Sequence, residues 1–157
     1  MTGWRIGYTA GPASIIKAMS NIQSHSTSNP AQASQWASLE AISGSQEAMQ
    51  SMKVEFEKRR KVLVEGLNNI TGVQCIEPKG AFYAFPNISS SFGKNCASGT
   101  ITDAVTFCEY LLKDQLVAAV PGSAFGAEGF IRLSYATSME NINAALERID
   151  LFFSSLS

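Results

Sequence analysis

The spacing of apolar residues changes at Thr71-Gly72, and this change constrains the fold more than any other feature of the sequence. From Ser45 to about Asn68 the apolar residues recur at intervals of three, four and seven, which predicts one long helix. After Gly72 they alternate with polar residues, which is the period of a β-strand. The residues that set the helical period are Met49, Met52, Phe56, Leu63 and Leu67. The chain therefore passes from a helical part into a part that contains a sheet.

Residues 72–157 are predicted to form a compact α+β unit, in which two helices cover a small antiparallel sheet. The predicted strands are Val73–Cys75, Ala81–Phe85, Leu116–Val120 and Phe130–Ala136. The first two flank a turn at Pro78-Lys79-Gly80, so we expect them to pair with each other. The helices follow Thr100–Asp103 and Thr137–Glu140, which both have the spacing of a capping box. Small and polar residues without a clear period predict a mobile loop from Ser89 to Gly99.

The first 44 residues are predicted to be part of a neighbouring domain. Three apolar residues alternate with polar or small ones at the start of the chain, which predicts a short strand with Arg5 on its other face. These three residues are Trp4, Ile6 and Tyr8. One helix is expected after Gly11-Pro12, and a second helix is expected to open at Asn29-Pro30 and to end at Gly44.

The composition excludes several classes of function. Hydrophobic residues make up 45% and charged residues 16% of the 157 residues, which is ordinary for a globular protein. A net charge of −1 gives no reason to expect a nucleic acid or an anionic membrane as a partner. No apolar run approaches the ~18 residues that a membrane span needs. The basic cluster Lys58–Lys61 has glutamates around it and is predicted to be a solvated helix face.

The cysteines and the histidine argue against disulfide and metal sites. Cys75, Cys96 and Cys108 are odd in number and lack Cys-x-x-Cys spacing, which favours free thiols in a reducing cytoplasm. His25 is the only histidine, so a multi-histidine metal site is excluded, and we predict no metal. We interpret His25 as a loop residue, with a Ser-His-Asp arrangement around it as the alternative.

Two arginines are the candidate binding residues. Arg5 lies between two glycines, so it reaches solvent, pairs with a carboxylate, or binds an anion that the glycines allow to approach. Arg132 lies on the polar face of its predicted strand, where it forms a structural salt bridge or binds a ligand carboxylate with its planar fork. The glycine-rich segment Gly122–Gly126 is predicted to be a turn and not a P-loop, because no lysine follows it and the next element is a strand.

Four segments of the chain, taken in order, resemble one enzyme family. They are Met1–Tyr8 (Met-Thr-Gly-Trp-Arg-Ile-Gly-Tyr), Gly80–Pro86 (Gly-Ala-Phe-Tyr-Ala-Phe-Pro), Val120–Gly126 (Val-Pro-Gly-Ser-Ala-Phe-Gly) and Phe130–Ala136 (Phe-Ile-Arg-Leu-Ser-Tyr-Ala). Each is similar to a segment of the class I and II aminotransferases, the aspartate aminotransferase family of fold-type I pyridoxal-phosphate enzymes. In that family the first segment follows the Schiff-base lysine. The resemblance therefore implies the C-terminal portion of an α/β enzyme, starting just after that lysine.

The resemblance implies a role for each arginine and a cofactor, pyridoxal 5'-phosphate. Arg5 matches the family's ligand for the cofactor phosphate, and Arg132 matches its ligand for the substrate α-carboxylate. The Schiff-base lysine would lie before Met1, so this match leaves the chain without a catalytic residue. None of the lysines in the chain follows a serine, and we expect no transaminase activity from the chain by itself.

The resemblance also implies a domain organisation and substrates. Residues 1–44 match the tail of the large pyridoxal-phosphate-binding domain, residues 45–71 a connecting helix, and residues 72–157 the small α+β domain. The implied parent is a cytoplasmic homodimer that acts on aspartate and a 2-oxo acid such as 2-oxoglutarate. The segment Gln23–Pro30 has no arginine for a distal carboxylate, and Met1–Arg5 resembles the bacterial-type subgroup, in which aspartate and sometimes prephenate are the partners and the distal group is recognised by the front part of the enzyme. An aromatic or prephenate aminotransferase is the alternative. The alternative outside enzymes is a non-catalytic module for dimerisation or regulation.

Overall fold

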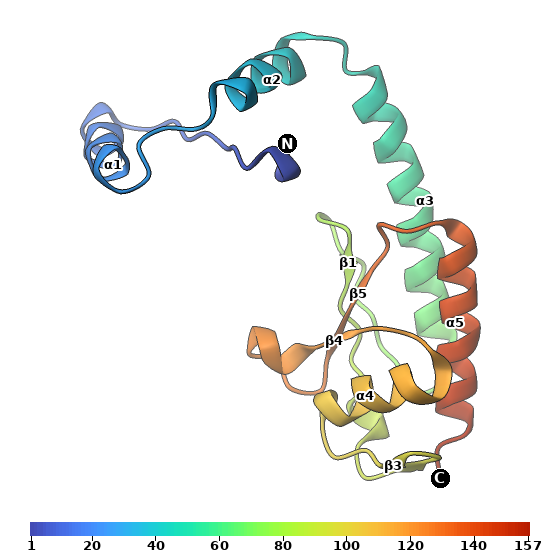
Figure 1. Ribbon diagram of the computed structural model, residues 1–157. Helices are drawn as coiled ribbons and strands as arrows, with labels where there is room; N and C mark the ends of the chain where they lie inside the picture. Colours follow the sequence, from blue (N-terminus) through green and yellow to red (C-terminus); the bar gives the residue numbers. More distant parts are fainter. The chain divides into compact units, whose positions relative to one another are not determined.

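The computed structural model describes residues 1–157 apart from the side chain of Thr2, and it divides into two units. The first unit is Met1–Gln50 and the second is Ser51–Ser157. Figure 1 labels the α-helices and most of the strands, and each unit is described by itself. No described helix is long and apolar enough to cross a membrane.

The first unit is helical throughout its regular structure. Its elements are the 3-10 helix η1 (Thr2–Trp4), α1 (Ala13–Ser26) and α2 (Gln32–Ser43). The strand predicted at the start of the chain is wrong, because Trp4 N donates a hydrogen bond to Met1 O at 3.0 Å and Arg5 has a φ of 52°. A strand needs a neighbour for its backbone N–H and C=O groups. The described residues of this unit form no strand that could pair with it, and the chain closes a local turn instead.

Proline and glycine mark helix ends in the first unit. Pro12 is the N-cap of α1, and Gly44 is the C-cap of α2, close to the positions predicted from the sequence. The polar end of α1 remains helical, and the hydroxyls of Ser24 and Ser26 donate to carbonyls of the same helix at 2.8 Å. His25 therefore lies in the last turn of α1, and its interpretation as a loop residue is wrong.

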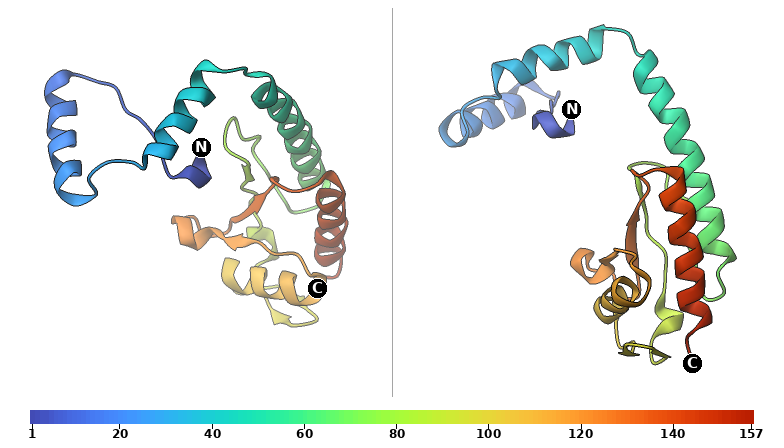
Figure 2. Two further views of the ribbon diagram at one scale, coloured as in Figure 1. Left: turned by 45° about the horizontal axis from the view of Figure 1, so that its top comes forward. Right: turned by 45° about the vertical axis from the view of Figure 1, so that its right-hand side comes forward.

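The second unit packs three helices against a small antiparallel sheet. Two of them are the helices predicted to cover the sheet, and the third is α3, which was predicted as a separate connecting helix but shares the same core. The sheet has the strand order β1-β5-β4. Helices α3 and α5 lie side by side in Figure 1 and in both views of Figure 2. The elements are α3 (Glu47–Asn69), β1 (Tyr83–Ala84), α4 (Ala104–Gln115), β4 (Val120–Pro121), β5 (Ile131–Ser134) and α5 (Met139–Ser154).

The strand pairing differs from the prediction. Val73–Cys75 does not form a ladder with Ala81–Phe85, and Gln74 forms only an isolated bridge with Asn87, which follows the second segment. Strand β1 pairs with β5 instead. This pairing buries Ala84 completely beside the buried Leu133, so the apolar face of the sheet decides it.

The segment predicted to be a mobile loop contains regular structure. It holds the 3-10 helix η2 (Ser89–Ser91) and a hairpin of β2 (Asn95–Cys96) and β3 (Gly99–Thr100). Asn95 and Ser157 also exchange two backbone hydrogen bonds of 2.9 and 3.2 Å. Strands of two residues are too short to show a period in the sequence, which explains the wrong prediction.

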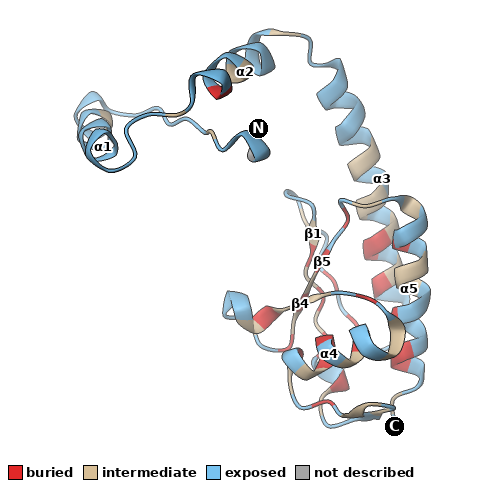
Figure 3. Ribbon diagram, in the orientation of Figure 1, coloured by how far each residue is buried: buried red, intermediate tan, exposed pale blue. Residues whose placement is uncertain are grey.

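The core of the second unit lies between the sheet and its helices. Leu67, Phe107, Ile131 and Phe152 come from four different elements, and each is at most 1% exposed. The rings of Phe107 and Phe152 meet edge to face with centroids 5.4 Å apart. In Figure 3 the buried positions are concentrated in this unit.

Candidate functional site

The sheet of the second unit has an apolar face and a face that carries Arg132. The register places Tyr83 opposite Ser134 and Ala84 opposite Leu133. Because successive side chains of a strand point to opposite faces, Arg132 shares its face with Ser134 and Tyr83. Ala84 and Leu133 point the other way and are buried in the core. The second candidate arginine therefore lies on the face of the sheet that the core does not use.

Arg132 is held by two aromatic rings. Its guanidinium carbon Cζ lies 4.4 Å from the centroid of the Tyr83 ring and 4.6 Å from that of the Phe125 ring. Among the described residues, Arg132 forms no salt bridge and donates no side-chain hydrogen bond. Of the two alternatives for Arg132, the structural salt bridge is thus not formed among the described residues. A guanidinium that stacks on rings uses its flat face, and its N–H groups in the plane can still bind a carboxylate.

The glycine-rich segment brings Phe125 to Arg132. Residues Gly122–Phe125 form the 3-10 helix η3, which follows β4 directly. Gly122 N donates to Phe130 O at 2.7 Å, and a Cβ on Gly122 would lie only 2.6 Å from that same oxygen. Gly126 ends η3 with a φ of 72°, a conformation that glycine adopts without strain. The segment is therefore a tight turn, and a strand follows it, as predicted.

More aromatic rings border this site. Phe85 stacks on Phe130 with centroids 5.2 Å apart and meets the edge of Phe125 at 6.2 Å. Phe82 lies 4.4 Å from Tyr83, measured between ring centroids. Phe125 is 50% exposed, so the rings form a surface and not an interior. A carboxylate on this surface would meet Arg132 in a partly desolvated setting, where a charge-assisted hydrogen bond is stronger than in water.

Arg5 belongs to the first unit, at the turn that follows η1. It borders a hollow of about 500 Å³ together with Met1, Ile6 and Gly7. A Cβ added at Gly3 or Gly7 would meet no atom within 4 Å, so the backbone on both sides of Arg5 is open to an approaching group. A guanidinium beside an open glycine backbone fits a phosphate, which Arg binds through its planar fork. Arg5 and Arg132 thus lie in different units.

Two of the cysteines are poor nucleophiles. Burial raises the pKa of the Cys75 thiol, and it raises the pKa of Cys108 to about 11. Both are therefore protonated near neutral pH, and the thiol is much less reactive than the thiolate. Within the described residues, no three His, Cys, Asp or Glu side chains come together where they could hold a metal ion.

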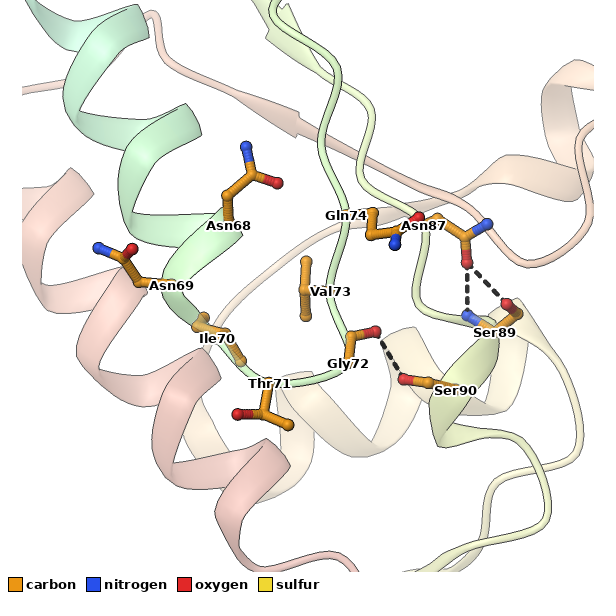
Figure 4. Close-up of a pocket in the computed structure, with 10 residues that line it drawn as sticks. All are labelled: Asn68, Asn69, Ile70, Thr71, Gly72, Val73, Gln74, Asn87, Ser89 and Ser90. Carbon is orange, nitrogen blue, oxygen red and sulfur yellow. Dashed lines mark hydrogen bonds between the residues drawn. The ribbon is translucent and has the colours of Figure 1, made fainter.

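A separate hollow of about 640 Å³ lies beside the end of α3 (Figure 4). Much of its polar lining is already hydrogen-bonded within the chain. Ser90 Oγ donates to Gly72 O at 2.6 Å, and Asn87 Oδ1 accepts from Ser89 N at 2.9 Å and from Ser89 Oγ at 2.7 Å. The bond from Ser90 holds the turn after α3 against η2, and the bonds to Asn87 fix the start of η2, so we assign the hollow a structural role.

Tyr83 and Phe125 are the site residues that the sequence interpretation missed. Both lie in segments that stood out as motifs, but neither was connected to Arg132. The predicted pairing of Ala81–Phe85 with Val73–Cys75 hid the contact with Tyr83, because it placed β1 beside the wrong strand. Tyr83 and Phe85, which are two residues apart in a predicted strand, were the available signal for a ring-lined face.

Comparisons with known proteins identify the family of the chain. Residues 1–149 match the family described as aminotransferase class I and II. The aspartate/prephenate aminotransferase of Cereibacter sphaeroides is 49% identical over 158 residues, which cover 100% of this chain and 40% of that protein. An aspartate aminotransferase of Rhizobium meliloti is 49% identical over 150 residues, which cover 95% of the chain and 37% of that protein.

Solved structures give the same result. The crystal structure of the aspartate aminotransferase from Rhizobium meliloti superimposes with a TM-score of 0.91 at 48% identity, covering 100% of this chain and 40% of that one. An aromatic aminotransferase from Pyrococcus horikoshii superimposes with a TM-score of 0.83 at 36% identity and covers 98% of the chain. The chain spans about 40% of the length of the first relatives it matches. By sequence and by fold, the chain belongs to the class I and II aminotransferases.

Proposed function

We propose that the chain is part of a pyridoxal-phosphate-dependent aminotransferase. Its reaction moves an amino group between an L-amino acid, with aspartate as the first choice, and a 2-oxo acid such as 2-oxoglutarate. The observation that carries the proposal is Arg132, whose guanidinium rests on two rings and forms no salt bridge with a described carboxylate. The names of the relatives from Cereibacter sphaeroides and Rhizobium meliloti support the same reaction. The resemblance further supports a cytoplasmic homodimer as the parent.

Arg132 binds the substrate α-carboxylate in this proposal. Two parallel N–H donors of a guanidinium match the two oxygens of a carboxylate, so the pair fixes orientation as well as position. Fixing the carboxylate orients the bonds around the adjacent Cα, and such positioning supplies a large part of the barrier reduction in many enzymes.

Arg5 binds the phosphate of the cofactor in this proposal. The open glycine backbone on either side lets a dianion reach the guanidinium without a steric clash. When bound, pyridoxal phosphate supplies an electron sink for the carbon from which a proton is removed. Arg5 anchors the end of the cofactor that does not react, so it contributes orientation and affinity and no proton transfer.

A chimera tests the proposed function. Residues 1–157 replace the matching segment of the Rhizobium meliloti aspartate aminotransferase, which this chain resembles at 48% identity and a TM-score of 0.91. We expect aspartate–2-oxoglutarate turnover by the chimera. Arg132→Lys should lower kcat/KM by about 10- to 100-fold, because Lys cannot form the bidentate pair and a hydrogen bond between charged groups is lost.

Arg148→Lys is the matched control for this experiment. Arg148 is an exposed arginine of α5 whose only described hydrogen bond goes to Gln115 O at 3.4 Å, so its exchange should leave kcat/KM within about twofold. A folded but inactive chimera, or equal losses for Arg132→Lys and Arg148→Lys, would contradict the proposal. The 157-residue chain by itself should show no turnover.

An aromatic or prephenate substrate is the second candidate. The rings beside Arg132 favour it, since Phe125 is half exposed and an aromatic side chain gains from contact with such a surface. One relative is an aspartate/prephenate aminotransferase, and another is an aromatic aminotransferase. The ratio of kcat/KM for prephenate to that for aspartate should then be higher in the chimera than in the parent enzyme, and an unchanged ratio would favour aspartate alone.

A further inference from the structure

We propose that Tyr83 and Phe125 are positioning residues that clamp the Arg132 guanidinium, so that it offers its N–H edge to a carboxylate in a fixed orientation. The inference rests on the proposed function, because it takes a carboxylate as the ligand of Arg132. It adds two residues, from two other elements of the fold, that act on the ligand through Arg132.

The positions of the rings support a clamp. Tyr83 comes from β1 and Phe125 from the helix η3 that follows β4, and these two strands flank β5 on opposite sides. Tyr83 is opposite Ser134, so it is a diagonal neighbour of Arg132 on the same face of the sheet. With Cζ at 4.4 and 4.6 Å from the two centroids, both rings are within the range of a cation–π contact.

A clamp gives Arg132 an advantage as a ligand-binding residue. A long arginine side chain loses conformational freedom when it is fixed, and that loss normally opposes binding. If the rings already hold the guanidinium in the free protein, this loss of entropy occurs when the chain folds. It then no longer opposes ligand binding. Because the rings contact the flat face of Arg132 and accept none of its N–H groups, these donors and the positive charge are left for the carboxylate.

A second arginine of the chain shows the contrast. The Cζ of Arg59 lies 5.5 Å from the centroid of the Phe56 ring, but Arg59 Nε also donates to Glu55 Oε1 at 3.0 Å. The charge of Arg59 is thus partly neutralised by a neighbour on the same helix. Arg132 has rings and no described carboxylate, which is the arrangement expected of a site that awaits an anion.

The test is side-chain NMR of the full 157-residue chain with ¹⁵N-labelled arginine. The Nε–H signal of Arg132 is assigned through its loss in Arg132→Lys, and maleate is the carboxylate probe. In the wild type we expect maleate to shift this signal saturably, and we expect slow rotation of the guanidinium about its Nε–Cζ bond. Phe125→Leu and Tyr83→Leu should each weaken maleate binding about two- to fivefold and speed the rotation.

Conservative variants and a control separate positioning from folding. Phe125→Tyr and Tyr83→Phe keep a ring and should retain both the affinity and the slow rotation. Phe56→Leu removes the ring beneath the salt-bridged Arg59 and should change neither readout. Backbone amide spectra like that of the wild type show that each variant is folded, and if Tyr83→Leu fails to fold, Phe125→Leu carries the test because Phe125 is half exposed.

The outcomes distinguish the two proposals. Weaker binding and faster rotation in the Leu variants, with both properties kept in the ring-retaining variants, support the clamp. Unchanged binding and rotation in the Leu variants overturn the clamp and leave Arg132 as the carboxylate ligand. If maleate does not shift Arg132 in the folded wild type, the carboxylate role fails, and the clamp proposal fails with it.

Discussion

The two units of the chain have similar apolar patterns but differ in burial. In Met1–Gln50, Ser34 is the only residue among those described that is buried, whereas Ser51–Ser157 contains every buried apolar side chain. The helices of the first unit carry large apolar residues that are about half exposed or more. They are Ile15, Met19, Ile22, Trp36, Leu39 and Ile42. An apolar stripe thus predicts a helix reliably, but burial needs a partner surface within the same unit.

The same difference affects the two candidate arginines. Arg132 lies on a strand whose other face is in the core, so the folded chain fixes its backbone. Arg5 lies in the unit that has no buried apolar side chain, where Ser34 Oγ donates to O of the neighbouring Trp4 at 2.9 Å. We therefore expect substitutions in the second unit to change stability far more than matched ones in the first.

The largest expected effect comes from the core of the second unit. Phe107→Ala removes a fully buried ring that contacts Phe152 and Phe153, and it should lower the free energy of unfolding by about 3 to 5 kcal/mol. Trp36→Ala is the matched change in the first unit, where the ring is 65% exposed, and it should cost at most about 0.5 kcal/mol. Urea unfolding followed by circular dichroism measures both. Equal losses would contradict the contrast between the units.

A smaller effect is expected from helix capping, which also differs between the units. Asp103 Oδ1 accepts a hydrogen bond from Thr106 N at 2.8 Å and caps α4, three residues after the predicted capping residue Thr100. The N-caps of α1 and α2, Pro12 and Ala31, form no such side-chain bond. Asp103→Ala should therefore lower the free energy of unfolding by about 1 kcal/mol at pH 7.

The capping effect should depend on pH. The hydrogen bond from the Thr106 backbone, more than any other cause, lowers the pKa of Asp103 below its ordinary value of 3.8. Stability from a lowered pKa is fully present above the unfolded-state value and is lost as the pH falls through the folded-state value. The difference between wild type and Asp103→Ala should thus shrink below pH 4. Asp103→Asn retains a capping oxygen without this titration, so the difference in unfolding free energy between Asp103→Asn and Asp103→Ala should not change with pH. If the difference between wild type and Asp103→Ala also stayed constant below pH 4, Asp103 would not be the titrating cap.

The smallest effect is expected from removing most of the first unit. A chain that begins at Ser45 keeps the whole of α3, including Ser45 Oγ as acceptor for Glu47 N. Its free energy of unfolding should differ from that of the full chain by less than about 0.5 kcal/mol, because every buried apolar side chain is retained. Unfolding at a much lower urea concentration would show that the first unit contributes to the core.

Local signals in the sequence predict helices well and strand pairing poorly. Gly44 as the end of α2 and the long period of α3 were predicted to within two residues, because caps and periods act over a few neighbours. The pairing of β1 with β5 depends on which distant strand covers the apolar face, and no local signal specifies that. The sequence of its own strand was therefore enough to identify Arg132 as a candidate. The rings of Tyr83 and Phe125 that contact it were found only in the structure.

The pairing of β1 with β5 also has a consequence for folding kinetics. It joins segments that are distant along the chain, and the bond from the Tyr135 hydroxyl to Ala81 O spans 54 residues. Closing so long a loop costs entropy before the contacts form, so high-contact-order pairings tend to form slowly. The surroundings of Arg132 should therefore assemble late. A bound carboxylate would then act mainly by slowing unfolding and would hardly speed folding.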